Sequence, residues 1–299
     1  MFTKAEAVAF LQNSWDIQKV EERLKNDRKR LIEEVVIQIQ SRVPFQNITL
    51  MAAPLEQRRR PNVKDIKQAC MKGVGGLCYS LNVFTWGLLQ GLGLHVQLCP
   101  ATCTTSVTYP NNHLFVLVRD LEANGDLHLI ECGVGVPTFQ VVSLNFDHES
   151  PVFKDSYLEY KFIRHDGQIL RMHGDGDTMK RNDPPKEGLD FYIGKWRRMY
   201  YFTVKPTECL SDFDTIFDEV FTVPGRTPFH HSPRAIWFPG QRAILFVNNR
   251  SLVEEDKGQL KLTVMENDGQ TLDFFCCNFP TIDQEDVCKA IIEWHHVSE

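Results

Sequence analysis

The stretch "GVGGLCYSLNVFTWGLLQGLG", residues 73–93, marks the change from helical to extended patterning along the chain. Apolar residues recur at helical spacing from Leu81 to Leu89, which predicts a helix that begins near Cys78 and ends at Gly91 or Gly93. The glycines before the cysteine have no side chain, so backbone amides can approach closely and leave room for a substrate. The N-terminus of a helix favours the thiolate form of a cysteine. By itself this pattern fits either a nucleophile or a buried structural cysteine.

The segment before this stretch is predominantly helical in pattern. Thr3 and Glu6 form a capping-box pair, and residues 16–40 show helical apolar spacing typical of one helix or a helix pair. Residues 63–72 predict a short helix that Gly73 closes. We therefore expect a helical bundle over residues 1–92.

The remainder of the chain is rich in strand patterns, which predicts an α+β fold. An antiparallel β unit is expected over residues 93–205, with a polar inserted loop at about 171–189. Residues 206–299 combine further strand patterns with a final amphipathic helix. The strands are expected at residues 94–100, 112–120, 127–133, 157–163, 197–204, 234–239, 243–248, 259–265 and 271–276.

Composition excludes several classes of function. The chain has 299 residues, of which 42% are hydrophobic and 24% charged, and its formal net charge is -6, so we expect no nucleic-acid partner. The basic run Arg58–Arg60 is interpreted as a solvated loop. No apolar run reaches the ~18 residues of a membrane helix, and the first residues do not resemble a signal peptide. We expect a cytoplasmic monomer without a membrane partner.

The nine cysteines are odd in number and irregularly spaced. In a reducing compartment they are expected to be free thiols. Cys99, Cys103 and the pair Cys276–Cys277 have no further ligands at zinc spacing, so no metal site is expected.

Three residues occur in the order nucleophile, base and orienting carboxylate. His113 opens an apolar strand, where a surface role is also possible, and Glu131 lies inside another apolar strand, where an acid needs a partner. With Cys78 they match the logic of a catalytic triad. A two-residue turn at Asn124–Gly125 would place Glu131 roughly 17 Å from His113 on the opposite face. The triad therefore predicts a longer loop, at about 120–126.

The motifs "VPFQNI", "GGLCYSLN", "NHLFVLV", "ECGVGVP" and "YYFTVKP…DF" resemble, in that order, signatures of the arylamine N-acetyltransferases. The resemblance implies that residues 1–92 form a helical bundle, residues 93–205 a β-barrel and residues 206–299 an α/β lid, around a papain-like Cys-His-acid core. It implies acetyl transfer from acetyl-CoA to an aromatic amine or hydrazine, as in xenobiotic metabolism, through an acyl-cysteine. Cys78 would be the nucleophile, His113 the base and Glu131 the orienting acid.

The same resemblance suggests further site residues. Tyr109, Gly135 and Phe221 are expected to contact the cofactor, and Asn112, together with His113, the acceptor substrate. No glycine-rich phosphate cradle is evident in the sequence.

The chain departs from the family pattern at four positions. Val74 stands where the family has Arg, Gln46 and Ser80 stand where it has Glu, and Glu131 replaces the usual Asp. Loss of one member of a buried ionic network costs about 3–5 kcal/mol, whereas loss of all members can be neutral. The joint loss therefore argues against simple decay of the motif.

Three functions remain open from the sequence. The first is a CoA-dependent N-acyltransferase. The second is a cysteine hydrolase or transglutaminase-like enzyme with the same triad. The third is a non-catalytic homologue that binds CoA, an aromatic ligand or a protein partner, which the changes at Gln46, Val74 and Ser80 favour more than an intact motif would.

Overall fold

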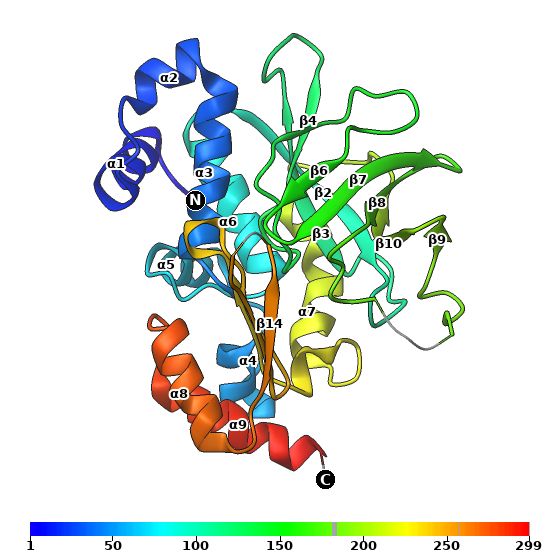
Figure 1. Ribbon diagram of the computed structural model, residues 1–299. Coiled ribbons are helices and arrows are strands. Elements are labelled where there is room, and N and C mark those ends of the chain that lie inside the picture. Colours follow the sequence, from blue (N-terminus) through cyan, green and yellow to red (C-terminus); the bar gives the residue numbers. More distant parts are fainter. Residues whose placement is uncertain (181–183, 257, 299) are drawn as a thin grey trace.

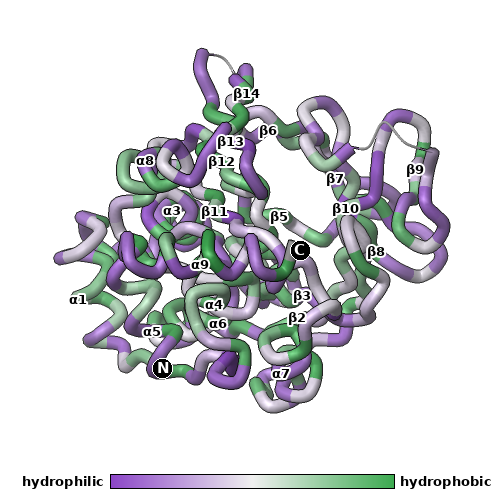
Figure 2. Tube along the Cα trace, turned by 90° about the horizontal axis from the view of Figure 1, so that it is seen from below, coloured by the Kyte–Doolittle hydropathy of each residue, from purple (hydrophilic) through white to green (hydrophobic). Residues whose placement is uncertain are grey.

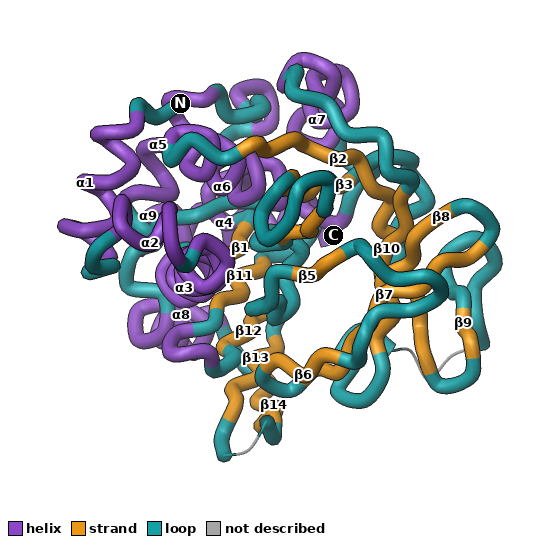
Figure 3. The backbone as a smooth tube through the Cα atoms, turned by 90° about the horizontal axis from the view of Figure 1, so that it is seen from above, coloured by secondary structure: helices purple, strands orange, loops and turns teal. Residues whose placement is uncertain are grey.

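The computed structural model describes residues 1–180, 184–256 and 258–298. Helices gather on one side of the molecule and a large sheet lies on the other, as Figures 1 and 3 show. The expected α+β class is confirmed. Within the described ranges, no helix is both long and apolar enough to cross a membrane.

The first part of the chain is helical, as predicted. Thr3 caps α1, since its Oγ1 accepts a hydrogen bond from the Glu6 amide at 3.2 Å while the Glu6 carboxylate accepts from the Thr3 amide at 2.8 Å. Residues 16–40 contain a helix pair rather than one helix. The helices are α1 (Lys4–Trp15), α2 (Val20–Asn26), α3 (Arg28–Arg42), α4 (Ile48–Ala52), α5 (Val63–Met71) and α6 (Cys78–Gly91).

Helix α6 lies at the centre of the fold. All of its residues except Gln90 are buried, and it packs against the neighbouring sheet. A helix that is enclosed on every side has little freedom to move, so its first residue, Cys78, is held in a fixed position. Figure 2 shows hydrophilic segments of the chain on the outside of the molecule near β14.

The predicted antiparallel barrel is present as a strongly curled antiparallel sheet (Figure 3). Its strand order is β5-β4-β3-β2-β10-β8-β7-β6, and β9 pairs with β10. Its strands are β2 (His95–Cys103), β3 (His113–Arg119), β4 (Leu127–Ile130), β5 (Val142–Ser143), β6 (Phe153–Asp155), β7 (Leu158–His165), β8 (Gln168–His173), β9 (Tyr192–Ile193) and β10 (Trp196–Phe202).

The predicted first residue of the inserted loop, at about 171, is too early, because β8 extends to His173. The first three residues of the predicted loop belong to β8, where Arg171 is wholly buried and pairs across the ladder with Phe162. A charged residue at this position suggests a loop, but the Arg171 side chain is buried and stacks on the Tyr160 ring, 4.2 Å from its centroid. The strand was therefore not predicted. Residues 181–183 of the expected loop lie outside the described part of the chain.

The connection between β3 and β4 is longer than a two-residue turn, as the triad hypothesis requires. Arg119 pairs with Leu127, so residues 120–126 form the loop. The Asp126 carboxylate accepts hydrogen bonds from the amides of Leu121, Glu122 and Ala123, each at 2.8 Å. This register brings Glu131, directly after β4, to the same face as His113.

The last part of the chain forms a smaller antiparallel sheet with helices. Its order is β1-β11-β12-β13-β14, and the outer strand β1 (Phe45–Gln46) comes from the N-terminal segment. The other elements are α7 (Asp214–Thr222), β11 (Arg234–Trp237), β12 (Ile244–Val247), β13 (Arg250–Glu254), β14 (Leu260–Val264), α8 (Asp268–Asn278) and α9 (Gln284–Ser298).

Two sequence-based predictions in or near this region are wrong. Residues 271–276 form part of α8 rather than a strand, because the Asn267 side chain caps the helix and accepts from the Gln270 amide at 3.0 Å. Arg58 is buried, not solvated, and donates to Glu293 of α9 at 2.6 Å. Helix α4 packs against α9, so the first and last parts of the chain are joined here (Figure 1).

Candidate active site

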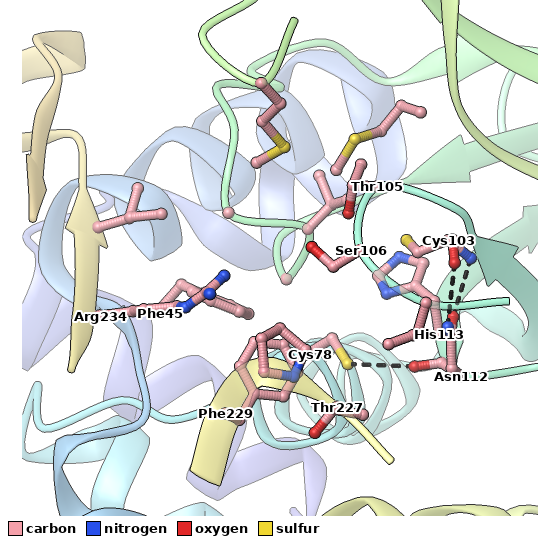
Figure 4. Close-up of a pocket in the computed structure, with 18 of the residues that line it drawn as sticks. Phe45, Cys78, Cys103, Thr105, Ser106, Asn112, His113, Thr227, Phe229 and Arg234 are labelled. Carbon is pink, nitrogen blue, oxygen red and sulfur yellow. Dashed lines mark hydrogen bonds between the residues drawn. The ribbon is translucent and has the colours of Figure 1, made fainter. Parts of the chain in front are cut away.

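The three predicted catalytic residues come together at the ends of three elements. Cys78 is the first residue of α6, His113 the first residue of β3, and Glu131 follows β4. His113 Nε2 lies 2.6 Å from Glu131 Oε2. Cys78 and His113 lie beside the same cavity (Figure 4). Since Glu131 engages Nε2, the other ring nitrogen of His113, Nδ1, is left for the thiol.

The loop before Cys78 depends on its glycines. Gly75 has a φ of 78°, and a Cβ at this position would lie 1.9 Å from the Pro44 carbonyl oxygen. The Gly76 amide donates to that oxygen at 3.2 Å, and the Gln46 amide donates to the Gly76 carbonyl at 3.0 Å. The loop is therefore pinned to the 44–46 segment, which positions the start of α6.

Gly133 allows the end of β4 to reach the first turn of α6. A Cβ on Gly133 would lie 2.9 Å from both Cα and O of Cys78 and 2.6 Å from Asn82 Nδ2. Its amide also donates to Glu131 Oε1 at 2.9 Å. The glycine of the "ECG" motif therefore serves the close contact between the acid and the thiol.

Asn82 is a positioning residue that the sequence analysis missed. Its Nδ2 donates to Glu131 Oε1 at 3.0 Å and to the Leu114 carbonyl at 2.7 Å, and its Oδ1 accepts from the Cys132 amide at 3.1 Å. The sequence could have indicated Asn82 by its position one helical turn after Cys78, which places both side chains on the same face of α6.

Burial and mutual attraction set the charges of the His113–Glu131 pair. Burial disfavours the imidazolium, but the Glu131 carboxylate and a hydrogen bond with the Cys78 side chain raise the pKa of His113 well above its usual value. Burial likewise disfavours the carboxylate, but His113, Asn82 and the Gly133 amide lower the pKa of Glu131. The two shifts favour a charged imidazolium–carboxylate pair.

A second thiol, Cys103, lines the same cavity but is unsuited to nucleophilic attack. Burial raises the pKa of the Cys103 thiol to about 12, so it stays protonated near neutral pH. Its backbone amide and carbonyl are held by the Asn112 side chain at 2.8 and 3.0 Å. Cys78 is therefore the thiol that the site presents beside His113.

The cavity has a volume of about 100 Å³ and combines predicted with unpredicted residues. Asn112, His113 and Gly135 line it, and their binding of substrate or cofactor stays a prediction. The sequence analysis did not find the lining residues Phe45, Ser106, Thr227, Phe229 and Arg234. Several of these lie on the lid side, far from Cys78 along the chain, and carry no motif of their own.

Two of the residues expected to contact the cofactor lie elsewhere. The Tyr109 hydroxyl donates to Glu219 of α7 at 3.1 Å, and Arg226 stacks on its ring. Phe221 packs edge-on against Tyr79, with ring centroids 6.2 Å apart. Neither occurs among the described residues that line the cavity at Cys78, so their assignment stays a prediction.

The three positions at which the family's charges are missing lie together. Gln46, Val74 and Ser80 line a second cavity on the other side of the loop before Cys78. Gln46 Nε2 donates to Thr49 Oγ1 at 3.1 Å and to the Val74 carbonyl at 3.4 Å. Hydrogen bonds between neutral groups therefore hold the loop at these positions.

Across residues 1–180, 184–256 and 258–298, no three His, Cys, Asp or Glu side chains are grouped so that they could hold a metal ion. Cys78, His113 and Glu131 provide a thiol, an imidazole and a carboxylate, and these groups can support acyl transfer through a covalent intermediate.

Comparisons with solved structures show that other proteins share this fold. Solved structures with the same fold include the arylamine N-acetyltransferase of Nocardia farcinica, with a TM-score of 0.73, 16% identity, and coverage of 98% of this chain and 97% of that chain. The M. smegmatis arylamine N-acetyl transferase has a TM-score of 0.68 at 17% identity, with 92% and 95% covered. The Mycobacterium marinum enzyme, solved in complex with CoA, has a TM-score of 0.68 at 14% identity, with 88% and 92% covered.

At such identities the structures show a shared fold, and the family assignment needs sequence evidence. A comparison with curated protein sequences gives no match. The model of a family described as N-acetyltransferase, however, matches residues 31–280, which include all three members of the triad and most of the chain. This protein therefore belongs to the arylamine N-acetyltransferase family.

Proposed function

We propose that this acyltransferase moves an acetyl group from acetyl-CoA to an aromatic amine or hydrazine through an acyl-Cys78 intermediate. The observation that carries the proposal is the Cys78 thiol, which opens into a cavity beside a buried His113–Glu131 pair 2.6 Å apart. The CoA complex of the M. marinum enzyme supports the choice of donor.

In the first half-reaction, Cys78 Sγ attacks the thioester carbonyl carbon of the donor. His113 Nδ1 holds the proton that the thiol gives up, while Glu131 fixes the ring through Nε2. The first N–H groups of α6 have no partner within the helix and favour negative charge near Cys78. The carbon–sulfur bond to the donor thiol then breaks, and His113 returns the proton to the departing thiolate.

In the second half-reaction, the acceptor amine attacks the carbonyl carbon of acyl-Cys78. His113 removes the proton from the attacking nitrogen, and the bond between the acyl carbon and Cys78 Sγ breaks. The products are the N-acetylated amine and the original thiol–imidazole pair. Phe45 and Phe229 line the cavity and offer aromatic surfaces to a flat acceptor.

The cavity also suits the charge of the donor. No Asp or Glu occurs among the described residues that line it, so a polyanionic thioester meets no fixed negative charge on its way to Cys78. The buried Glu131 carboxylate is held by His113, Asn82 and Gly133 and is not open to this space.

The test is the intact mass of the protein after brief exposure to acetyl-CoA. We expect one acetyl adduct in the wild type and in the Cys103→Ala control, none in Cys78→Ala, and discharge of the adduct by an arylamine. Discharge by water alone at the same rate would favour a hydrolase. If no adduct forms while CoA still binds, the chain is a binding protein that has kept the fold without its chemistry.

A further inference from the structure

Arg234 lines the cavity, and no acid in the described part of the chain forms an ion pair with it. It opens β11, and its side chain points from the lid side into the cavity, as Figure 4 shows. Its Nε is fully buried and has no hydrogen-bond partner. Among the described residues no acid lies within ion-pair distance of the guanidinium, whose Cζ lies over the Phe229 ring, 5.9 Å from its centroid.

Other arginines buried in this fold are satisfied. Arg197 donates to both carboxylate oxygens of Asp177, at 2.6 and 3.0 Å. Arg58 donates to Glu293 and to the carbonyls of Ala53 and Met51. A guanidinium stays charged in proteins, and a partly buried one without acceptors is unfavourable. Arg234 differs from both, because its Nε has no hydrogen-bond partner, and among the described residues it is the arginine that lines the active-site cavity.

The backbone of Arg234 is held firmly, so the side chain leaves it from a fixed point. The Arg234 amide donates to Asn47 Oδ1 at 2.6 Å, and the Arg234 carbonyl accepts from the Asn47 amide at 3.1 Å. Asn47 Nδ2 also donates to the carbonyls of Phe229 and Ser232, each at 2.8 Å. One buried asparagine therefore places both Arg234 and Phe229 at the cavity.

We propose that Arg234 is a specificity-determining residue that binds an anionic group of a substrate in this cavity. The inference rests on the proposed function, since it places the substrates of acyl-Cys78 chemistry here. The planar guanidinium fork matches a carboxylate or a phosphate. The anion is either a carboxylate on the aromatic acceptor or a phosphate of the donor, and both would supply the acceptors that Arg234 lacks.

The test measures equilibrium binding by calorimetry in the Cys78→Ala background, where no acylation occurs. One probe pair is 4-aminobenzoate and its neutral analogue 4-aminobenzamide, and the other is CoA and phosphate-free pantetheine. Each pair is measured with Arg234, Arg234→Met and Arg234→Lys. Arg242→Met is the control, because Arg242 is an exposed lid arginine whose guanidinium donates to the Glu254 and Glu255 carbonyls.

Arg234→Met is expected to weaken binding of one anionic probe by about 10- to 100-fold, the size of a lost charged hydrogen bond. The neutral partner and the control should be unchanged, and Arg234→Lys should recover part of the affinity. Loss confined to 4-aminobenzoate assigns the anion to the acceptor, and loss confined to CoA assigns it to the donor.

The inference is overturned if both anionic probes bind Arg234→Met as they bind the parent, or if neither binds better than its neutral analogue. This result is independent of the mass test. Anion binding through Arg234 without acylation of Cys78 would refute the proposed function alone. Acylation of Cys78 without any contribution from Arg234 would refute this inference alone.

Discussion

Glu131→Gln offers the sharpest test of how the triad works. Glu131 Oε1 accepts from Asn82 Nδ2 and from the Gly133 amide, and Oε2 faces His113 Nε2. A glutamine must turn its oxygen toward the two fixed donors, so its NH2 group faces His113. The ring can then only accept at Nε2, which places its proton on Nδ1, the nitrogen needed by Cys78.

The expected loss follows from this change of tautomer. With its proton on Nδ1, a neutral His113 cannot take the proton of the Cys78 thiol, and no carboxylate remains to favour an imidazolium. Substitutions that lock a triad histidine in the wrong tautomer cost about 10⁴-fold. We expect acylation to slow by about 10³- to 10⁴-fold, or about 4–5.5 kcal/mol of activation free energy. The fold should survive because every hydrogen bond of the carboxylate has a substitute.

The assay is the burst of p-nitrophenol released from p-nitrophenyl acetate in rapid mixing, which reports acylation without CoA. Glu254→Gln is the matched control, since Glu254 is a buried glutamate of the lid sheet that accepts from the Ala243 amide at 2.8 Å. Glu131→Asp keeps the charge but withdraws it by one methylene, about 1.5 Å, and should fall between the wild type and Glu131→Gln.

The reasoning is refuted if folded Glu131→Gln acylates within about tenfold of the wild type, because the barrier would then not depend on the tautomer. An equal loss in Glu254→Gln would instead point to a general effect of removing a buried charge.

Three further predictions concern the same site. The free energy of unfolding of the wild type should exceed that of Glu131→Gln most between about pH 4.5 and 6.5, as urea titrations can measure. The lowered pKa of Glu131 makes its contribution fade below 4.5, and the raised pKa of His113 makes its contribution fade as pH rises above 6.5. Gly133→Ala should slow the acylation burst by about 100-fold or more, since its Cβ would lie 2.9 Å from Cys78 Cα, whereas Gly269→Ala in the first turn of α8 should not. Gln46→Ala should lower the free energy of unfolding by about 1–2 kcal/mol, because the Val74 carbonyl and the Thr49 hydroxyl lose a partner; an unchanged urea midpoint would contradict this role.

Much of the local structure was predictable because it is encoded over short distances. The helix that begins at Cys78 and the strand that begins at His113 were found from periodicity. The loop at 120–126 followed from requiring His113 and Glu131 to meet on one face. Each of these predictions needed only neighbouring residues and the geometry of a helix or a sheet.

Errors arose where distant packing overrode the local pattern. The aromatic run at 271–276 suits a strand, but Asn267 caps it as a helix, and Phe275 is buried in the cluster that α9 completes. Arg58 follows a pattern typical of a surface loop, yet it is buried against Glu293 of α9, more than two hundred residues away. Neither partner is visible from the local sequence.

The sequence by itself placed Cys78, His113 and Glu131 at the boundaries of a helix and two strands, because the periodicity of each element is local. Their catalytic roles rest on the family resemblance and stay a prediction. Only the tertiary structure decided which side chains share the cavity with them. In strand β1, Phe45 pairs with Ile236 of β11. This pairing holds residues from the last part of the chain beside the cavity that Cys78 lines. Phe229 and Arg234 reach the cavity through that contact, which no short-range pattern can reveal, because it forms only when segments nearly two hundred residues apart share one sheet.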